Sequence, residues 1–215
     1  MLRAYNALKN LLAMVGLAAL ASLLLLLPPE GDSLLAGAPA EPAPLSAVAA
    51  GAIRSHSLEP QLEHEQRAVT QYISRRYRVS EVAVGSFVAT AYEAGARHSL
   101  DPLLILAVMA VESRYNPVAK SGMGAKGLMQ VIPRFHLEKL ADHGGELALL
   151  EPEVNILVGA QILREYLNRF RNLETALQMY AGALDEPTSQ YSAKVFAEKA
   201  RLDGLRQKAK KQQSV

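Results

Sequence analysis

A single carboxylate stands where an apolar helix is expected to end. The residues from Leu103 to Val111 are all apolar, and a helix that is apolar on every side is buried on every side. Glu112 follows directly, and Pro117 a little further on disfavours helical backbone at the residue before it. We therefore expect the Glu112 carboxyl in the last turn of a buried helix.

This position predicts an unusual ionisation for the glutamate. Poor solvation disfavours the carboxylate anion, and the negative end of the helix dipole disfavours it too. Both effects raise the pKa, and a carboxyl that keeps its proton near neutral pH can act as a general acid. The alternative interpretation is that Glu112 only pairs with Arg114 or meets water at the helix end.

A glycine-rich loop follows the glutamate and favours the first interpretation. The stretch "SGMGAKGLMQ" contains Gly122, Gly124 and Gly127, and glycine permits positive φ angles and close backbone approach, which suit the lining of a groove. Gln130 adds an amide that can bind sugar hydroxyl or acetamide groups, next to two flexible apolar side chains.

The stretch "ESRYNPVAKSGMGAKGLMQVIP" closely resembles the signature of lytic transglycosylases of the soluble-lytic-transglycosylase (SLT, family 1) type. "LDPLLILAVMAVES" is similar to the helix that leads into this signature, and "NILVGAQILREYLNRF" with "ALQMYAGA" is similar to later helices of the family. The resemblance implies a lysozyme-like fold and cleavage of the β-1,4 bond between N-acetylmuramic acid and N-acetylglucosamine in peptidoglycan, without a metal or other cofactor.

The resemblance also implies roles for individual residues. Glu112 would protonate the glycosidic oxygen and then act as base toward the muramyl C6 hydroxyl, which closes a 1,6-anhydro ring. The substrate-binding residues would be Ser113, which orients the carboxyl, Tyr180, which hydrogen-bonds near it, and Met129, Gln130, Ser121 and Gly127 along the groove, with Asn116 as a structural residue of the turn.

One carboxylate is sufficient for this chemistry. Glycosidases that use two carboxylates need them about 5–9.5 Å apart, and residues 110–133 contain no second Asp or Glu. A single acid suffices if the acetamido group and a hydroxyl of the substrate supply the remaining steps. Glu138 and Asp142, further along the chain, are expected on a surface helix.

The chain departs from the family pattern after Tyr180, where Ala181 stands in place of a common asparagine; "PRFH" also lacks a common threonine. A lost hydrogen bond costs about 0.5–1.5 kcal/mol, which weakens an enzyme without abolishing it. Two alternatives therefore stay open. One is a catalytically weak or inactive peptidoglycan-binding or assembly protein on the same fold, and the other is a goose-type-like muramidase, which is a hydrolase.

From about residue 60 onward, apolar residues recur at the three- and four-residue spacing of helices. Stretches that alternate apolar and polar residues, as strands do, are not convincing. Asp101 followed by Pro102 is a strong helix start, and Ser80 is a plausible one. We expect a mainly α (α+β lysozyme-like) fold, with a single α-helical catalytic domain at residues 58–200 and a basic, solvated C-terminal tail at residues 201–215.

The N-terminus has the layout of an export segment, residues 1–27. Arg3 and Lys9 precede an apolar run at residues 11–27, and acidic residues follow it, which predicts that the remainder crosses the membrane. We favour an uncleaved inner-membrane anchor with the domain in the periplasm of a Gram-negative bacterium. Cleavage at the small residues Ala36 to Ala38, which would give a soluble periplasmic protein, is the alternative.

Composition narrows the remaining possibilities. Residues 28–57 are rich in Pro, Ala, Gly and Ser and predict a flexible tether. The chain has no cysteine, which excludes disulfides and thiolate metal sites, and its net charge of +2 is too evenly spread to indicate nucleic acid. The scattered histidines, His136 among them, are expected to be surface or capping residues. We expect a monomer that binds peptidoglycan glycan strands.

Overall fold

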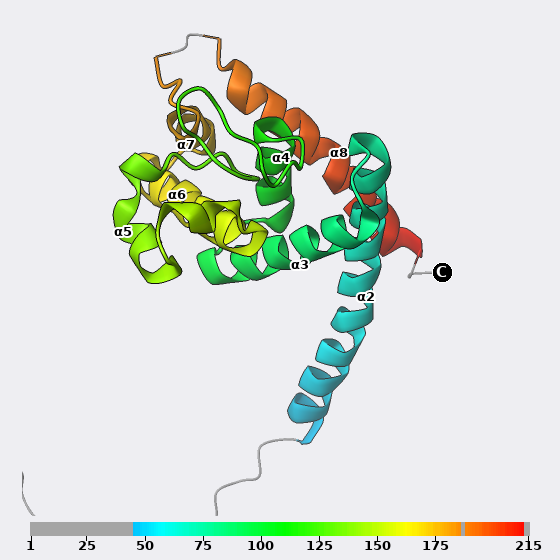
Figure 1. Ribbon diagram of the computed structural model, residues 1–215. Coiled ribbons are helices and arrows are strands. Elements are labelled where there is room, and N and C mark those ends of the chain that lie inside the picture. Colours follow the sequence, from blue (N-terminus) through cyan, green and yellow to red (C-terminus); the bar gives the residue numbers. More distant parts are fainter. Residues whose placement is uncertain (1–44, 186–187, 213–215) are drawn as a thin grey trace, which may run out of the picture. The chain divides into compact units, whose positions relative to one another are not determined.

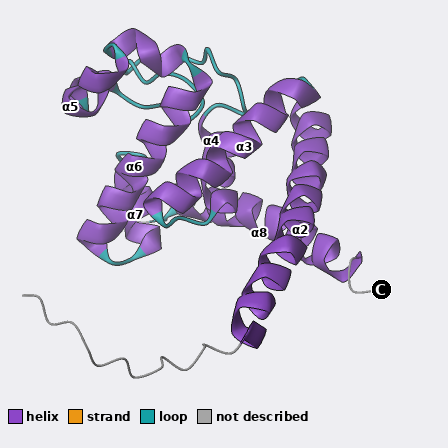
Figure 2. Ribbon diagram, turned by 90° about the horizontal axis from the view of Figure 1, so that it is seen from below, coloured by secondary structure: helices purple, strands orange, loops and turns teal. Residues whose placement is uncertain are grey.

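The computed structural model describes residues 45–185 and 188–212, and the side chains of residues 60–185 and 188–211. Figures 1 and 2 show helices joined by loops, without a strand in this part of the chain. The elements are α2 (Leu45–Tyr77), α3 (Glu81–His98), α4 (Pro102–Glu112), η1 (Pro133–Phe135), α5 (Leu137–Leu140), η2 (Ala141–His143), η3 (Glu146–Leu150), α6 (Pro152–Phe170), α7 (Leu173–Tyr180) and α8 (Gln190–Gln212). The predicted mainly helical fold is confirmed.

Helix α4 forms the buried centre of this domain. It begins as predicted, with Pro102 as its first residue and the Asp101 side chain accepting a hydrogen bond from the Leu103 N–H at 3.0 Å. Helices α3 and α8 both pack against it, and α6 packs against α3 and α7 (Figure 1). Because neighbours surround α4, every residue from Leu103 to Ala110 is buried, and the helix has no polar face.

Helix α8 corrects the prediction of a solvated tail. The chain stays helical from residue 201 to Gln212, and Leu202 and Ala209 are buried. These two residues continue a seven-residue spacing that starts at Val195, which is also buried, so all three lie on one face of the helix. The many basic residues between them hid this narrow apolar stripe in the sequence.

A network of charged side chains joins α2, α3 and α8 to the start of α4. Arg206 donates hydrogen bonds to Glu65 at 2.7 Å and to Asp101 at 2.9 Å. The Tyr92 hydroxyl donates to the same Glu65 oxygen at 2.5 Å, and Lys199 lies 2.8 Å from Asp101. Burial acts to raise the pKa of Asp101, but the bonds from Arg206 and Lys199 outweigh it and hold the pKa below its ordinary value.

We expect Arg206→Met to lower the free energy of unfolding by about 2–4 kcal/mol, because the buried Glu65 side chain would lose its ion-pair partner. The control is Lys208→Met, at an exposed position of the same helix, which should change stability by less than about 0.5 kcal/mol. Urea unfolding at neutral pH measures both. Equal stabilities of the two variants would show that the network contributes nothing.

The N-terminal boundary also differs from the prediction. Helix α2 begins at Leu45, so residues 45–57, which we predicted as part of a flexible tether, are helical. Alanine is frequent there and no proline occurs between Pro44 and Pro60, which favours a helix. Residues 28–44 and the predicted anchor at residues 1–27 lie outside the described part of the chain. Within residues 45–185 and 188–212, no helix has the length and apolar character needed to cross a bilayer.

Candidate active site

The end of helix α4 places Glu112 as the sequence predicted. The helix ends at Glu112, and the chain then turns sharply because Arg114 and Tyr115 both adopt left-handed backbone conformations, with φ of 53° and 64°. Such angles are uncommon for residues other than glycine. The fully buried Tyr115 side chain stabilises the turn, since its hydroxyl donates to the Leu106 carbonyl at 2.9 Å.

The surroundings of Glu112 raise its pKa to about 7. Burial is the main cause, because it disfavours the anion. A hydrogen bond from the Tyr191 hydroxyl to Glu112 Oε1, at 2.6 Å, stabilises the anion and acts in the opposite direction, but it is the weaker effect. Arg114 is not the partner of this carboxyl: its guanidinium lies 6.0 Å from the centre of the Tyr77 ring. The pKa shift predicted from the sequence is therefore present, with burial as its source.

Tyr191 is the residue that the sequence analysis missed, and it corrects the role predicted for Tyr180. Tyr191 lies at the start of α8, 79 positions from Glu112, and no local pattern connects the two. Tyr180 does not bond the carboxyl. Its hydroxyl donates to the backbone carbonyl of Met129 at 2.9 Å, so it fixes the loop beside the glutamate instead.

The hydrogen bond from Tyr191 leads to a testable shift in titration. In Tyr191→Phe the Glu112 anion loses a donor, so the pKa of Glu112 should rise above about 7, by about one pH unit. Titration of the carboxyl by carbon-13 NMR measures this directly. Tyr72→Phe is the control, because Tyr72 is not among the groups that shift the pKa of Glu112. An unchanged or lower pKa in Tyr191→Phe would contradict the assigned contact.

The loop after Glu112 is fixed from below by a buried asparagine on α6. Asn155, fully buried, accepts a hydrogen bond from the Met129 N–H at 2.7 Å and donates to the carbonyls of Lys126 at 2.8 Å and Leu149 at 2.9 Å. Gly127 passes directly over it with φ of 75°, and a Cβ there would lie 2.2 Å from Asn155 Nδ2. Gly127 therefore allows the close backbone approach predicted for this loop, but the group that it approaches is Asn155.

The side chains of three predicted site residues form hydrogen bonds with backbone groups only a few positions away. Ser113 donates to a carbonyl four residues earlier, at 3.2 Å. Asn116 accepts from an N–H two residues ahead, at 3.1 Å, within the turn. Ser121 accepts from N–H groups two and four residues ahead, at 3.2 and 3.1 Å. These bonds shape the loop, and none of them involves the Glu112 carboxyl.

Met129 is not in the position predicted along the groove, whereas Gln130 borders a cavity as predicted. The Met129 side chain is fully buried and packs on Gly159 of α6, where a Cβ would lie 2.6 Å from its sulfur. It is a core residue and cannot line a sugar groove. Gln130 does border a cavity, but its amide nitrogen donates to the carbonyls of Ala119 at 3.1 Å and Gly127 at 3.0 Å, which holds the loop closed.

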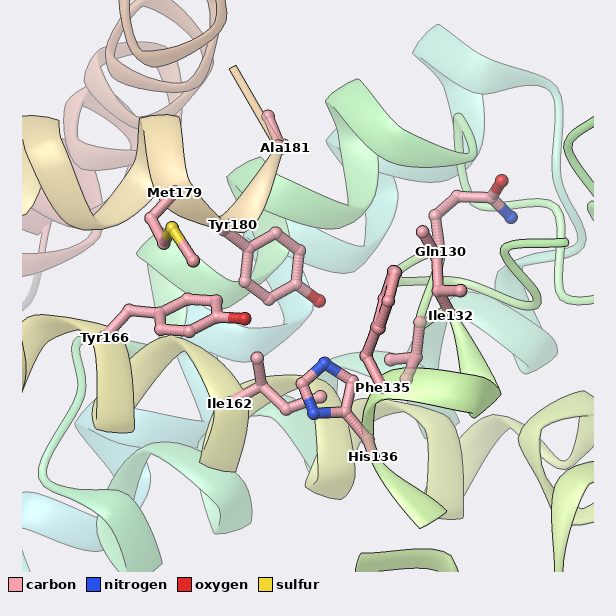
Figure 3. A pocket seen from close by; sticks show the side chains of 11 residues that line it. Gln130, Ile132, Phe135, His136, Ile162, Tyr166, Met179, Tyr180 and Ala181 are labelled. Carbon is pink, nitrogen blue, oxygen red and sulfur yellow. The ribbon is translucent and has the colours of Figure 1, made fainter. Parts of the chain in front are cut away.

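A cavity of about 370 Å³ lies on one side of Tyr180. Figure 3 shows that α6, α7 and the segment around η1 enclose it. Its lining residues are Gln130, Val131, Ile132, Phe135, His136, Ile162, Tyr166, Met179, Tyr180, Ala181 and Gly182. Ala181, where the family pattern has asparagine, therefore borders this cavity. Within the described residues, no cluster of three or more Asp, Glu or His side chains could hold a metal ion.

Comparison with known proteins agrees with this arrangement. The family model described as "Transglycosylase SLT domain" matches residues 89–200, which is more than half of the chain and includes Glu112, Asn155 and both tyrosines of the site. The chain therefore belongs to the transglycosylase SLT domain family. The X-ray structure of an inactive mutant of the lytic transglycosylase Slt from Pseudomonas aeruginosa shares the fold, with a TM-score of 0.50 and 24% identity over 56% of this chain and 24% of that chain.

Individual relatives match over part of their length. The "Transglycosylase" of Enterobacteria phage PRD1 is 38% identical over 108 residues, which is 48% of this chain and 39% of the phage protein. The "Soluble lytic murein transglycosylase" of Salmonella typhimurium is 40% identical over 72 residues, 31% of this chain and 11% of that protein. The "Membrane-bound lytic murein transglycosylase C" of Mannheimia succiniciproducens is 27% identical over 159 residues, 69% of this chain and 42% of that protein. The chain spans less than half the length of these relatives.

Proposed function

We propose that the protein is a peptidoglycan lytic transglycosylase, which cleaves the β-1,4 bond between N-acetylmuramic acid and N-acetylglucosamine and leaves a 1,6-anhydro ring on the muramyl product. The observation that carries the proposal is the position of the Glu112 carboxyl at the end of the buried helix α4, where burial raises its pKa to about 7. A carboxyl with this pKa is partly protonated near neutral pH, so it can donate a proton and afterwards accept one. Family membership supplies the class of substrate.

The reaction requires two proton transfers through one group. Glu112 gives its proton to the glycosidic oxygen while the bond from that oxygen to the muramyl C1 breaks, and the N-acetylglucosamine side leaves as an alcohol. The muramyl C6 oxygen then bonds to C1 and releases its proton to the Glu112 carboxylate, which restores the acid. Between these steps the anion would keep its hydrogen bond from Tyr191, which lies 2.6 Å from Oε1.

A two-carboxylate hydrolysis is less well supported. Burial and the Tyr191 hydroxyl account for the shifted pKa of Glu112, and no second carboxylate in the described part of the chain contributes to it. A nucleophile or base at about 5–9.5 Å, as two-carboxylate glycosidases require, would repel the anion and raise the pKa further. We infer that the substrate supplies the nucleophile.

The products decide between the proposal and its rivals. We would digest purified sacculi with the protein and weigh the released fragments by mass spectrometry. A transglycosylase gives anhydromuramyl fragments, which are lighter by one water than the reducing-end fragments from a muramidase. Reducing ends alone would overturn the transglycosylase proposal. Absence of release would favour a peptidoglycan-binding or assembly protein, for which the alanine at position 181 is the only support.

Periplasmic location and anchoring through residues 11–27 stay predictions, which N-terminal sequencing of the membrane fraction can test.

A further inference from the structure

The cavity beside Tyr180 contains two polar groups that the proposed reaction does not use. Its walls are mostly apolar, with Ile132, Ile162 and Met179 among them. The Tyr166 hydroxyl, from α6, and the His136 ring, from the residue after η1, point into the same space (Figure 3). Within the described part of the chain, neither of these two side-chain groups has a hydrogen-bond partner. His136 stands at the N-cap position of α5, as predicted for a capping residue, but its side chain makes no capping hydrogen bond and borders the cavity instead.

Both groups can donate and accept hydrogen bonds near neutral pH. Burial lowers the pKa of His136, and Lys139 lowers it further, while Glu138 and Glu165 act weakly in the opposite direction. The neutral imidazole then offers one N–H and one bare nitrogen. Burial raises the pKa of Tyr166, so its hydroxyl keeps its proton. Lys139 is engaged by carboxylates, at 2.8 Å from Glu138 and 2.9 Å from Glu165.

Gln130 and Tyr180 are the other polar residues of the lining, and the Gln130 amide nitrogen already donates to two carbonyls. Tyr180 is not free to donate to a ligand either. Its hydroxyl proton is donated to the Met129 carbonyl, and its ring packs edge-on against Tyr166, with 6.4 Å between the centroids. The Tyr180 ring therefore fixes one wall and the orientation of Tyr166. This leaves one imidazole and one phenol hydroxyl to bind a ligand, in a cavity within the usual size range of ligand sites.

We propose that His136 and Tyr166 bind an acetamido group of the substrate, its amide between the two polar side chains and its methyl against the apolar wall. An amide has one carbonyl acceptor and one N–H donor, which matches two partners that can each do either, and the methyl group matches Ile162 and Met179. This inference rests on the proposed function, because glycan strands with 2-acetamido groups would be the source. An acetylated peptide end has the same chemistry and is the alternative source.

The direct test is ligand binding to protein that carries Glu112→Gln, so that Glu112 neither reacts nor titrates. The probe is tri-N-acetylchitotriose at about pH 7.5, well above the pKa of the imidazole, measured by isothermal titration calorimetry. His136→Phe and Tyr166→Phe should each weaken binding about three- to tenfold, the usual effect of one hydrogen bond. Chitotriose without acetyl groups is the control ligand. The substitutions should not weaken its binding, because it lacks the acetamido groups. His143→Phe, at an exposed histidine, is the control and should bind the acetylated probe like the parent.

A second variant keeps the proposal testable if the phenylalanine variants do not fold. His136→Gln retains a donor and an acceptor but cannot ionise. When the pH falls through the pKa of His136, the imidazole takes up a proton and can only donate, so it must face the amide carbonyl, and the affinity of the parent should change with pH. His136→Gln should show no such change, because its amide does not titrate. An equal pH dependence in both proteins would overturn the assignment of His136.

The source of the acetamido group is decided by repeating the measurement with N-acetyl-L-alaninamide. If the substitutions weaken only the sugar, the ligand is the glycan, and if they weaken only the peptide amide, it is an acylated peptide. If they weaken neither, or if neither probe binds the parent, the proposal is wrong. These assays do not involve turnover. A protein that releases anhydromuramyl fragments but binds the probes independently of His136 would therefore keep its proposed function and lose this inference.

Discussion

Replacing Glu112 by glutamine should reduce the release of fragments from peptidoglycan by about 1,000-fold or more. General acid and base catalysis contribute about 10²–10⁴-fold each in enzymes, and the same carboxyl would supply both here. Glutamine keeps the size of the side chain and can still accept the hydrogen bond from Tyr191, so the geometry of the site should persist. Release of soluble muropeptides from sacculi, with the unchanged protein alongside, is the measurement. Comparable rates for the two proteins would end the assignment of Glu112 as the acid.

The same substitution should also change the free energy of unfolding. Measuring this change tests at the same time whether the variant is folded. The folded protein holds the pKa of Glu112 at about 7 instead of the ordinary 4.5, so ionisation is easier in the unfolded chain. Stability is therefore lost as the pH rises from the ordinary value through about 7. Because Glu112→Gln cannot ionise, we expect it to be more stable than the parent at about pH 8, by about 2 kcal/mol, and to lose this advantage near pH 4. Denaturant unfolding at the two pH values measures the difference.

Replacing Asn155 by leucine should lower the free energy of unfolding by about 3–5 kcal/mol, with a fall of about 10 °C in the melting temperature. The substitution removes the partner of the Met129 N–H and of the carbonyls of Lys126 and Leu149 at a fully buried position. Each unpaired buried group carries its own desolvation cost. We also expect activity to fall, because the loop between Glu112 and the cavity depends on these bonds.

The matched control lies on the same helix. Asn168 is an exposed residue of α6, so Asn168→Leu has the same change of composition and should alter stability by less than about 0.5 kcal/mol. Thermal unfolding followed by circular dichroism compares the two variants. A small effect at both positions would mean that water or a rearranged loop replaces the hydrogen bonds that Asn155 makes.

Features that depend on neighbours in the sequence were predictable. Asp101 and Pro102 define the start of α4 through the conformation of one turn, and the apolar run after them predicts a helix buried on all sides. The position of Glu112 and the direction of its pKa shift follow from these local facts. The helix at residues 152–170 carries equally clear spacing, and α6 has those bounds.

Features that depend on which elements meet in space were not predictable. Tyr191 reaches Glu112 only because α8 packs on α4, and nothing in the sequence around Tyr191 indicates that contact. Met129 is also ambiguous in the sequence, since a flexible apolar side chain suits either a groove or a core. Its burial depends on the missing side chain of Gly159, 30 positions later. His136 became a candidate binding residue only because it lines the same cavity as Tyr166.

The network around Arg206 has a practical consequence for anyone who wishes to excise the domain or fuse it to another protein. The segment shared with the family ends at residue 200 and begins at residue 89, yet Arg206 and its partner Glu65 lie beyond those limits on either side. A fragment cut at the family limits would leave Asp101, at the head of the central helix, without one of its two cations. The smallest piece able to stand alone should therefore extend from about residue 60 to the end of α8.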